Sequence, residues 1–346
     1  MPGHSRHDLE RTSHLVSFMP LHEQIARSME QDVGTLTKLI ALKASGDLPP
    51  IYTQHKVVTD HPDEPVLPIA IFMDAVPYSQ TDSVLGCWGL NVLSGERFLF
   101  GVLRKRNACR CGCRGWCSYD VLFRIARWSL DALAKKAWPT SRHTGEPWLP
   151  SDSARADLVG QPFPCRCACL YIKGDWAEYA HTFGLPTWHD GIRSCFACCG
   201  FGDDLYVHAG NDQHGLRWAS NAAGEYDAAC RRCEVRVVLS TRAQVAKVAK
   251  MLRWNKDPKG GRCMSRDLPE VGLLVGDRLE PSDTCPDVGQ FEELSVPVVV
   301  TFWRASENSF CRHRNPVLSD AIGVTFEDSM TVDTLHALYL GVMMVW

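Results

Sequence analysis

The chain has 346 residues, enough for one large domain or two of ordinary size. Hydrophobic residues make up 45% and charged residues 22%, which is usual for a globular protein and argues against a disordered chain or a coiled coil. With 37 basic and 40 acidic residues the net charge is −3, so contact with nucleic acid requires a local basic surface.

The cysteines indicate metal binding. The first 20 residues lack the apolar run of a secretory signal, and no stretch approaches the ~18 apolar residues of a membrane helix. We therefore expect a soluble, intracellular protein whose thiols stay reduced. Its 16 cysteines are clustered, which favours metal ligands over scattered disulfides. A disulfide-bonded protein remains the alternative that free thiols would exclude.

The first elements are a helix and three strands. Apolar residues at helical spacing predict one helix over 21–44, and the prolines at 62, 65 and 68 predict an extended linker with a domain boundary. Strands are expected over residues 69–74, 84–93 and 97–103, and a short connection containing Gly95 joins the last two as a hairpin.

A helix and a fourth strand follow. Ser118 is expected to cap a helix whose apolar stripe runs from Val121 to Leu133 and stops before Pro139. After a proline-rich loop, a strand is predicted over residues 168–172. Later elements are a strand over 235–239, a helix over 242–254, a strand over 297–302 and an apolar end over 334–346.

Two aspartates are candidates for metal-dependent catalysis. Asp74 and Asp175 each end a predicted strand, and their carboxylates converge if these strands are neighbours. A converging pair needs a neutralising cation, and Mg²⁺ takes oxygen ligands while keeping waters for substrate phosphates. Two such ions can activate the attacking oxygen and stabilise the leaving oxygen when a phosphodiester is cleaved. The alternative is that each aspartate only caps a turn.

Four segments in this order resemble eukaryotic cut-and-paste DNA transposases, in particular the CACTA/Plavaka-like group of the DDE ribonuclease H-like superfamily. They are AIFMDAVPY from Ala70, KGDWAE from Lys173, the knuckle Cys195-x-x-Cys198, and DTLHALYLG from Asp333. The resemblance implies an α/β ribonuclease H-like mixed sheet flanked by helices, with a zinc-knuckle insertion after the second acid. It also implies three catalytic acids and Mg²⁺- or Mn²⁺-dependent cleavage and transfer of DNA strands, with Asp74 as first acid and Asp175 as second.

The chain departs from this family in two places. Ala75 follows Asp74 where the family commonly has glycine, and alanine does not adopt a positive φ as readily as glycine does. The family's third acid lies well beyond the Asp333-x-x-His336 segment, and only ten residues follow His336, so that role has no residue and we interpret the chain as truncated. Glu178 is a candidate for positioning a metal-bound water. Asp333 and His336, on one face of a predicted helix, are either part of the active domain or an ordinary helix acid and histidine.

Cysteine pairs predict structural zinc. Cys195-x-x-Cys198 and Cys230-x-x-Cys233 together satisfy a tetrahedral Zn²⁺ site, and reduced core cysteines are the alternative. A second zinc, or else a cysteine-lined core, is predicted from the remaining clusters. Its candidate ligands are Cys109, Cys111, Cys113, Cys117, Cys165, Cys167 and Cys169.

A basic run beside the first cluster is a candidate DNA contact, with a solvated basic face as the alternative. It comprises Arg104, Lys105, Arg106, Arg110 and Arg114.

We divide the chain into an N-terminal helical segment (1–60), a catalytic core (61–190), a zinc-knuckle insertion (191–295) and a return to the core (296–346). The predicted function is a nuclear DNA transposase domain acting on transposon ends and target DNA, with a homo-oligomer as a candidate assembly. The alternative is an inactive, zinc-stabilised remnant that binds DNA or protein.

Overall fold

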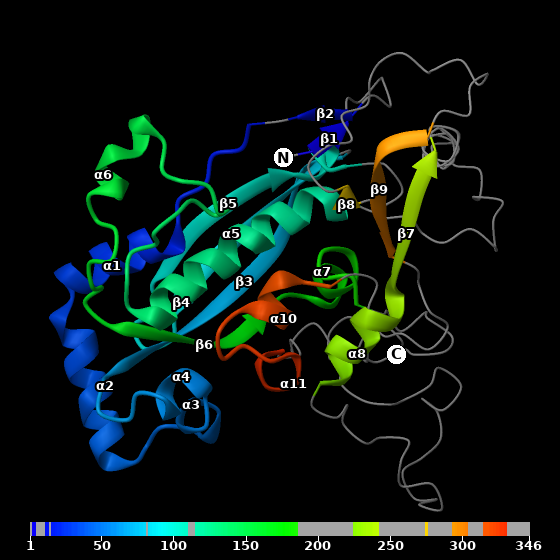
Figure 1. Cartoon of the computed structure of the whole chain (residues 1–346). Helices are drawn as coiled ribbons and strands as arrows, with labels where there is room; N and C mark the ends of the chain where they lie inside the picture. Colours follow the sequence, from blue (N-terminus) through cyan, green and yellow to red (C-terminus); the bar gives the residue numbers. More distant parts are fainter. Residues whose placement is uncertain are drawn as a thin grey trace, which may run out of the picture. The chain divides into compact units, whose positions relative to one another are not determined.

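The computed structural model describes residues 2–4, 11–13, 15–80, 82–109, 115–185, 224–241, 274–275, 293–303 and 314–330. The chain is mixed α/β and divides into two compact units (Figure 1). The sheet unit comprises Val16–Arg104, Asp120–Glu178 and Asn315–Trp346. The second unit comprises Met1–Leu15, Lys105–Tyr119 and Tyr179–Arg314. Residues 16–60 thus belong to the same unit as the main sheet.

An open four-stranded mixed sheet forms the sheet unit, in the order β5-β4-β3-β6. The strands are β3 (Val66–Ser79), β4 (Asp82–Asn91), β5 (Arg97–Arg104) and β6 (Arg166–Lys173). β4 pairs antiparallel with both β3 and β5, whereas β6 runs parallel to β3. All four predicted strands are confirmed. β3 begins earlier than predicted, so that Pro68 lies within the strand and not in a linker.

The helix α5 (Trp116–Lys135) crosses one face of this sheet (Figure 1). Side chains on that face are fully buried, among them Ile71, Met73 and Cys87. Leu122 packs so close to the sheet that a Cβ at Gly101 would lie 3.2 Å from it. Because side chains alternate along a strand, the other face carries a second set of residues, which includes Asp74. We call the side opposite α5 the open face.

α5 begins three residues earlier than predicted. Gly115 has a φ of 90°, and its carbonyl already accepts a hydrogen bond from the Ser118 amide at 2.9 Å. Ser118 therefore lies inside the first turn. Its hydroxyl accepts a hydrogen bond from the Cys109 amide at 2.9 Å and does not cap the helix.

Two helices stand where one was predicted over 21–44. α1 (Leu21–Gln31) and α2 (Val33–Ser45) meet at Asp32, whose carboxylate accepts a hydrogen bond from the Thr35 amide at 3.2 Å and so caps α2. The sheet unit also contains several short helices. They are α3 (Pro50–Thr53), α4 (Lys56–Thr59), η2 (Pro150–Asp152), α6 (Ser153–Ala156), α10 (Pro316–Asp320) and α11 (Phe326–Ser329).

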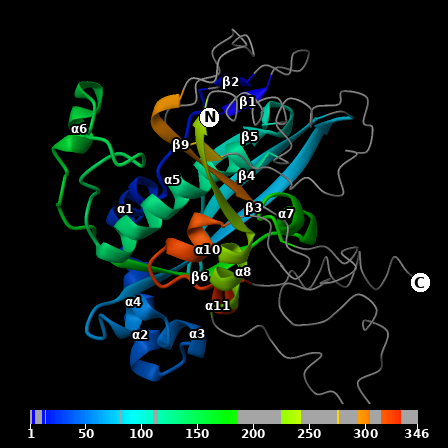
Figure 2. The ribbon, with the colours of Figure 1, turned by 45° about the vertical axis from the view of Figure 1, so that its right-hand side comes forward.

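The second unit contains β1 (Pro2–His4) paired with β2 (Arg11–Ser13), η1 (Lys105–Asn107) and a three-stranded antiparallel sheet. In that sheet β9 (Glu293–Trp303) lies between β7 (Glu234–Thr241) and β8 (Leu274–Val275), as Figure 2 shows for β7 and β9. α8 (Glu225–Cys233) leads directly into β7. The predicted strands over 235–239 and 297–302 are confirmed, and the predicted helix over 242–254 lies outside the described residues. Among the described helices, none has the length and apolar character needed to cross a membrane.

Candidate functional site

Asp74 and Asp175 were each predicted to end a strand, but Asp74 lies inside β3, which continues to Ser79, and Asp175 lies two residues beyond the end of β6. In the register of β3 and β6, Ile71 lies opposite Ile172 and Phe72 lies opposite Lys173. Asp74 and Asp175 each follow this last pair by two residues. Adjacent strands lie about 4.8 Å apart, so the register brings the two acids to the same level of the sheet.

Asp175 also begins a helix. Its Oδ1 accepts a hydrogen bond from the Glu178 amide at 2.6 Å, at the first turn of α7 (Trp176–His181). The alternative that this aspartate caps a turn is therefore correct as far as that oxygen is concerned. A carboxylate offers about four acceptor positions on two oxygens, so the cap leaves capacity for another ligand.

Asp74 is partly exposed on the open face, opposite Gly86 of β4. Within the described part of the chain it makes no hydrogen bond or ion pair. Two carboxylates at one level of a sheet repel each other unless a cation lies between them. The described residues contain no group of three or more metal-binding side chains, so any ion here would complete its coordination with water or substrate oxygens.

Glu178 lies toward the other face of the sheet. Its side chain is buried, and its negative charge adds to burial in raising the pKa of the Cys87 thiol. Cys87 is the neighbour of Met73 on the face that α5 covers, whereas Asp74 points to the open face. This placement favours a buried carboxylate beside Cys87 over the predicted role of Glu178 in positioning a water at Asp74.

The sequence analysis missed an aromatic pair next to Asp74. Phe72 and Trp88 are directly paired across β3 and β4, and their ring centroids lie 5.6 Å apart. The Trp88 ring lies over Gly86, where a Cβ would stand only 2.0 Å from the ring carbon Cη2. The sequence could have predicted that Phe72 lies beside Asp74, because side chains two residues apart on a strand share a face.

The cysteines of β6 form part of the core. Cys165, Cys167 and Cys169 are buried free thiols. Burial raises the pKa of Cys169 to about 12, and it raises the pKa of Cys167 well above its usual value. A hydrogen bond with Cys167 lowers the pKa of Cys165, so these two thiols are neighbours. This arrangement supports the cysteine-lined core that was the alternative to a second zinc site.

Of the remaining zinc candidates, some are described by the structure and others lie outside the described residues. Cys109 and Cys117 are buried in the second unit, and Cys111 and Cys113 lie outside the described residues. Cys230 is buried in α8. Cys233 ends the same helix, while Cys195 and Cys198 lie outside the described residues, so the knuckle stays a prediction.

The basic run is partly engaged in local contacts. Arg104 pairs with Asp82 at 3.2 Å, bonds the Tyr78 hydroxyl and lies 5.1 Å from the centroid of the Tyr78 ring. Lys105 and Arg106 form η1, and the other two arginines, Arg110 and Arg114, lie outside the described residues. Arg104 is therefore committed to the β3–β4 hairpin, and DNA contact by this run stays a prediction.

Asp333 and His336 lie outside the described residues. Asp333 comes three residues after Met330, whose backbone forms a parallel bridge with Ile172 of β6. Asp175 likewise comes three residues after Ile172. The two aspartates therefore stand at the same number of residues from a paired position.

We compared the chain with protein-family models, with curated proteins and with solved structures, and none of these comparisons found a match.

Proposed function

We propose that this chain is a transposase-derived domain of ribonuclease H-like fold that binds divalent metal at Asp74 and Asp175 and cleaves and joins DNA strands. The observation that carries the proposal is the register of β3 and β6, which gives both acids the same offset from the pair Phe72 and Lys173. The resemblance of the motifs around these acids to CACTA/Plavaka-like transposases supplies the reaction class.

The strand order supports the finer fold assignment. Three antiparallel strands, then a helix, then a fourth strand parallel to the first is the succession that the resemblance implies for the core. The first and fourth strands of that succession, β3 and β6, are neighbours in the sheet. This adjacency is what a site shared between Asp74, inside β3, and Asp175, just beyond β6, requires.

The donor atoms fit a hard cation. Asp74 offers a partly exposed carboxylate, and Asp175 offers the oxygen that does not cap α7. Bound Mg²⁺ or Mn²⁺ would lower the pKa of an attacking water and offset the charge of a phosphodiester. The two aspartates orient the reacting phosphate between the strands. Attack by water breaks a phosphodiester and leaves a 3′-hydroxyl and a 5′-phosphate. The 3′-hydroxyl then attacks a phosphodiester of the target DNA, which forms a new phosphodiester with the target 5′ end and releases a 3′-hydroxyl of the target strand.

Asp333 is our candidate for a further acid of this site. Met330 pairs in parallel with Ile172, and Asp333 and Asp175 each follow that bridge by three residues. This equal spacing supports testing Asp333 beside the two strand acids.

Plasmid nicking tests the enzyme proposal. We expect nicking in Mg²⁺ or Mn²⁺ that is lost in Asp74→Asn and Asp175→Asn, because an amide binds a hard cation far more weakly than a carboxylate. Asparagine can still cap a helix, so Asp175→Asn should keep α7. Asp63→Asn, which neutralises an exposed aspartate just before β3, is the control. Mn²⁺ binding followed by electron paramagnetic resonance should weaken in the two site variants and not in the control.

An inactive, zinc-stabilised remnant that binds DNA or protein is the second candidate function. The specific observation in its favour is that one carboxylate oxygen of Asp175 caps α7. This candidate expects zinc in the purified protein and DNA binding without nicking in either metal. Action on transposon ends in the nucleus, as a homo-oligomer, belongs to the first proposal and not to this one.

A further inference from the structure

We propose that the open face of the main sheet is a stacking surface for unpaired DNA bases, on which Phe72 and Trp88 hold the nucleotide next to the phosphate at Asp74. The position of that phosphate rests on the proposed function. The stacking surface itself can be tested without metal or activity.

The residues of the open face form rows across the strands. Lys173, Phe72, Trp88 and Leu99 are paired one after another from β6 to β5. The next row contains Asp74, Gly86 and Val102. Successive rows on one face are two residues apart, or about 6.7 Å, which is close to one nucleotide step of an extended single strand. A phosphate at Asp74 would therefore place the adjoining base over the aromatic row.

Val66 and Ala70 of the open face are fully buried, and the two faces differ in exposure only farther along β3. Every large side chain of β3 and β4 that faces α5 is almost fully buried, as Ile71 and Leu85 illustrate. On the open face Val76 is 54% exposed, Leu99 42% and Val102 39%. Phe72 and Trp88 are partly exposed between them. The aromatic pair thus occupies the central strands of an accessible surface.

Charge favours a polyanion over a neutral partner at this surface. Lys173 and Arg97 are exposed at opposite margins of the open face, on β6 and β5. Asp82 on the same hairpin is neutralised by Arg104. Asp74 is the other acid of these four strands, and a phosphate would meet it through a cation. Cations that flank aromatic rings are the usual composition of a single-strand binding surface.

The Trp88 ring is held in a defined place. It lies flat over Gly86, because a Cβ at that position would stand 2.0 Å from the ring, and Phe72 supports it from the neighbouring strand. Gly86 is in turn the direct partner of Asp74. A base that stacks on this ring is therefore fixed relative to the acid. Only an unpaired base can present its flat face to a sheet, so the ligand is single-stranded DNA or a frayed end.

Photocrosslinking tests the proposal directly. The full chain, in excess EDTA, is irradiated with oligothymidine that carries 5-iodouracil, and the crosslinked residue is identified by mass spectrometry. We expect crosslinks at Trp88 or Phe72. Crosslinks confined to residues outside the open face would overturn the proposal.

Affinity provides a second, quantitative readout. Loss of one stacking ring should weaken oligothymidine binding by about 10-fold in Trp88→Ala, and Trp88→Phe should retain most of it. Trp148→Ala is the matched control, because it removes another partly exposed tryptophan of the sheet unit. Equal affinities for Trp88→Ala, Trp88→Phe and Trp148→Ala would overturn the proposal and would assign the face to a protein partner.

The stacking proposal and the proposed function can fail separately. Nicking that requires Asp74 together with unchanged oligothymidine binding in Trp88→Ala would refute only the stacking surface. Crosslinks at Trp88 in a protein that never nicks DNA would support the surface and refute the enzyme. Thermal melting of each variant, followed by circular dichroism, identifies any loss that comes from unfolding.

Discussion

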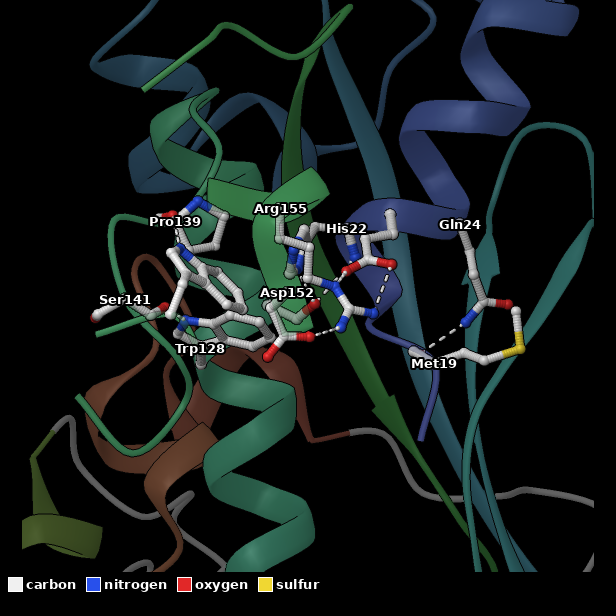
Figure 3. Close-up of polar contacts among 11 residues, drawn as sticks. Met19, His22, Gln24, Trp128, Pro139, Ser141, Asp152 and Arg155 are labelled. Atoms are coloured by element: carbon white, nitrogen blue, oxygen red, sulfur yellow. Dashed lines mark hydrogen bonds and ion pairs between the residues drawn. The ribbon is translucent and has the colours of Figure 1, made fainter. Parts of the chain in front are cut away.

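The Nδ1 atom of His22 lies 2.6 Å from the hydroxyl oxygen of Ser129, which joins α1 to α5. The same hydroxyl accepts a hydrogen bond from the His22 amide at 2.9 Å, and the tautomer of the imidazole sets the direction of its second hydrogen bond, with Nδ1. The rings of Trp128, Trp138 and Phe163 surround the imidazole. His22 is therefore a buried side chain that links α1 to α5 within the sheet unit (Figure 3).

The first prediction concerns acid stability. Burial, and secondarily the charge of Arg155, lowers the pKa of His22 from 6.5 to about 3. A depressed pKa means that the unfolded chain binds the proton more readily, so this contribution is complete above pH 6.5 and is lost as pH falls toward 3. His22→Gln should flatten the fall of unfolding free energy in this window by up to about 1.4 kcal/mol per pH unit. Urea titrations at several pH values measure it.

The matched control is His181→Gln, since His181 is exposed on α7. Its pH dependence should match the parent protein. Parallel curves for His22→Gln and the parent between pH 6.5 and 3 would contradict the prediction.

The second prediction concerns contact between the N-terminal helices and residues 314–330. Gly323 has a φ of 75°, and a Cβ there would stand 2.4 Å from Cε1 of the buried His55. Gly323→Ala should therefore lower the unfolding free energy by more than the roughly 1 kcal/mol that positive φ alone imposes on alanine. Gly145→Ala isolates the backbone effect, because Gly145 has a φ of 83° and nothing within 4 Å of its Cβ position. Equal losses of unfolding free energy in the two variants, measured by urea denaturation, would contradict the prediction, because they would show that the His55 ring moves aside without cost.

Local pattern predicted the strands of the main sheet and the helix between them, because alternation and helical periodicity are properties of neighbouring residues. The break between α1 and α2 at Asp32 was not predicted, because a side chain that caps α2 leaves the apolar spacing on either side unchanged. The shared level of Asp74 and Asp175 was expected only on the condition that their strands are neighbours, and the register supplies that condition. Glu178 and the Phe72–Trp88 pair depend on which face each residue takes, which strand pairing decides.

The third prediction concerns Gly86. Gly86→Ala should displace the Trp88 ring, because the new methyl group would overlap the ring carbons. Crosslinking at Trp88 should fall, while the carboxylates of Asp74 and Asp175 remain in place. Gly101→Ala on β5 is the control, since its Cβ would meet Leu122 at 3.2 Å and Cys87 at 4.0 Å on the face covered by α5. Undiminished crosslinking at Trp88 in Gly86→Ala would contradict the assigned ring position.

The fourth prediction concerns the thiols. Seven described cysteines are buried and form no disulfide, so they should resist iodoacetamide at pH 8 in the native protein and react fully in urea without a reductant. They are Cys87, Cys109, Cys117, Cys165, Cys167, Cys169 and Cys230. Cys169 should react more slowly than Cys165, which lies just before β6, because burial raises the pKa of Cys169 to about 12 whereas a hydrogen bond with Cys167 lowers the pKa of Cys165. Mass spectrometry of the alkylated peptides measures both. Peptides that stay unalkylated in urea until a reductant is added would instead show disulfides and exclude the reduced core.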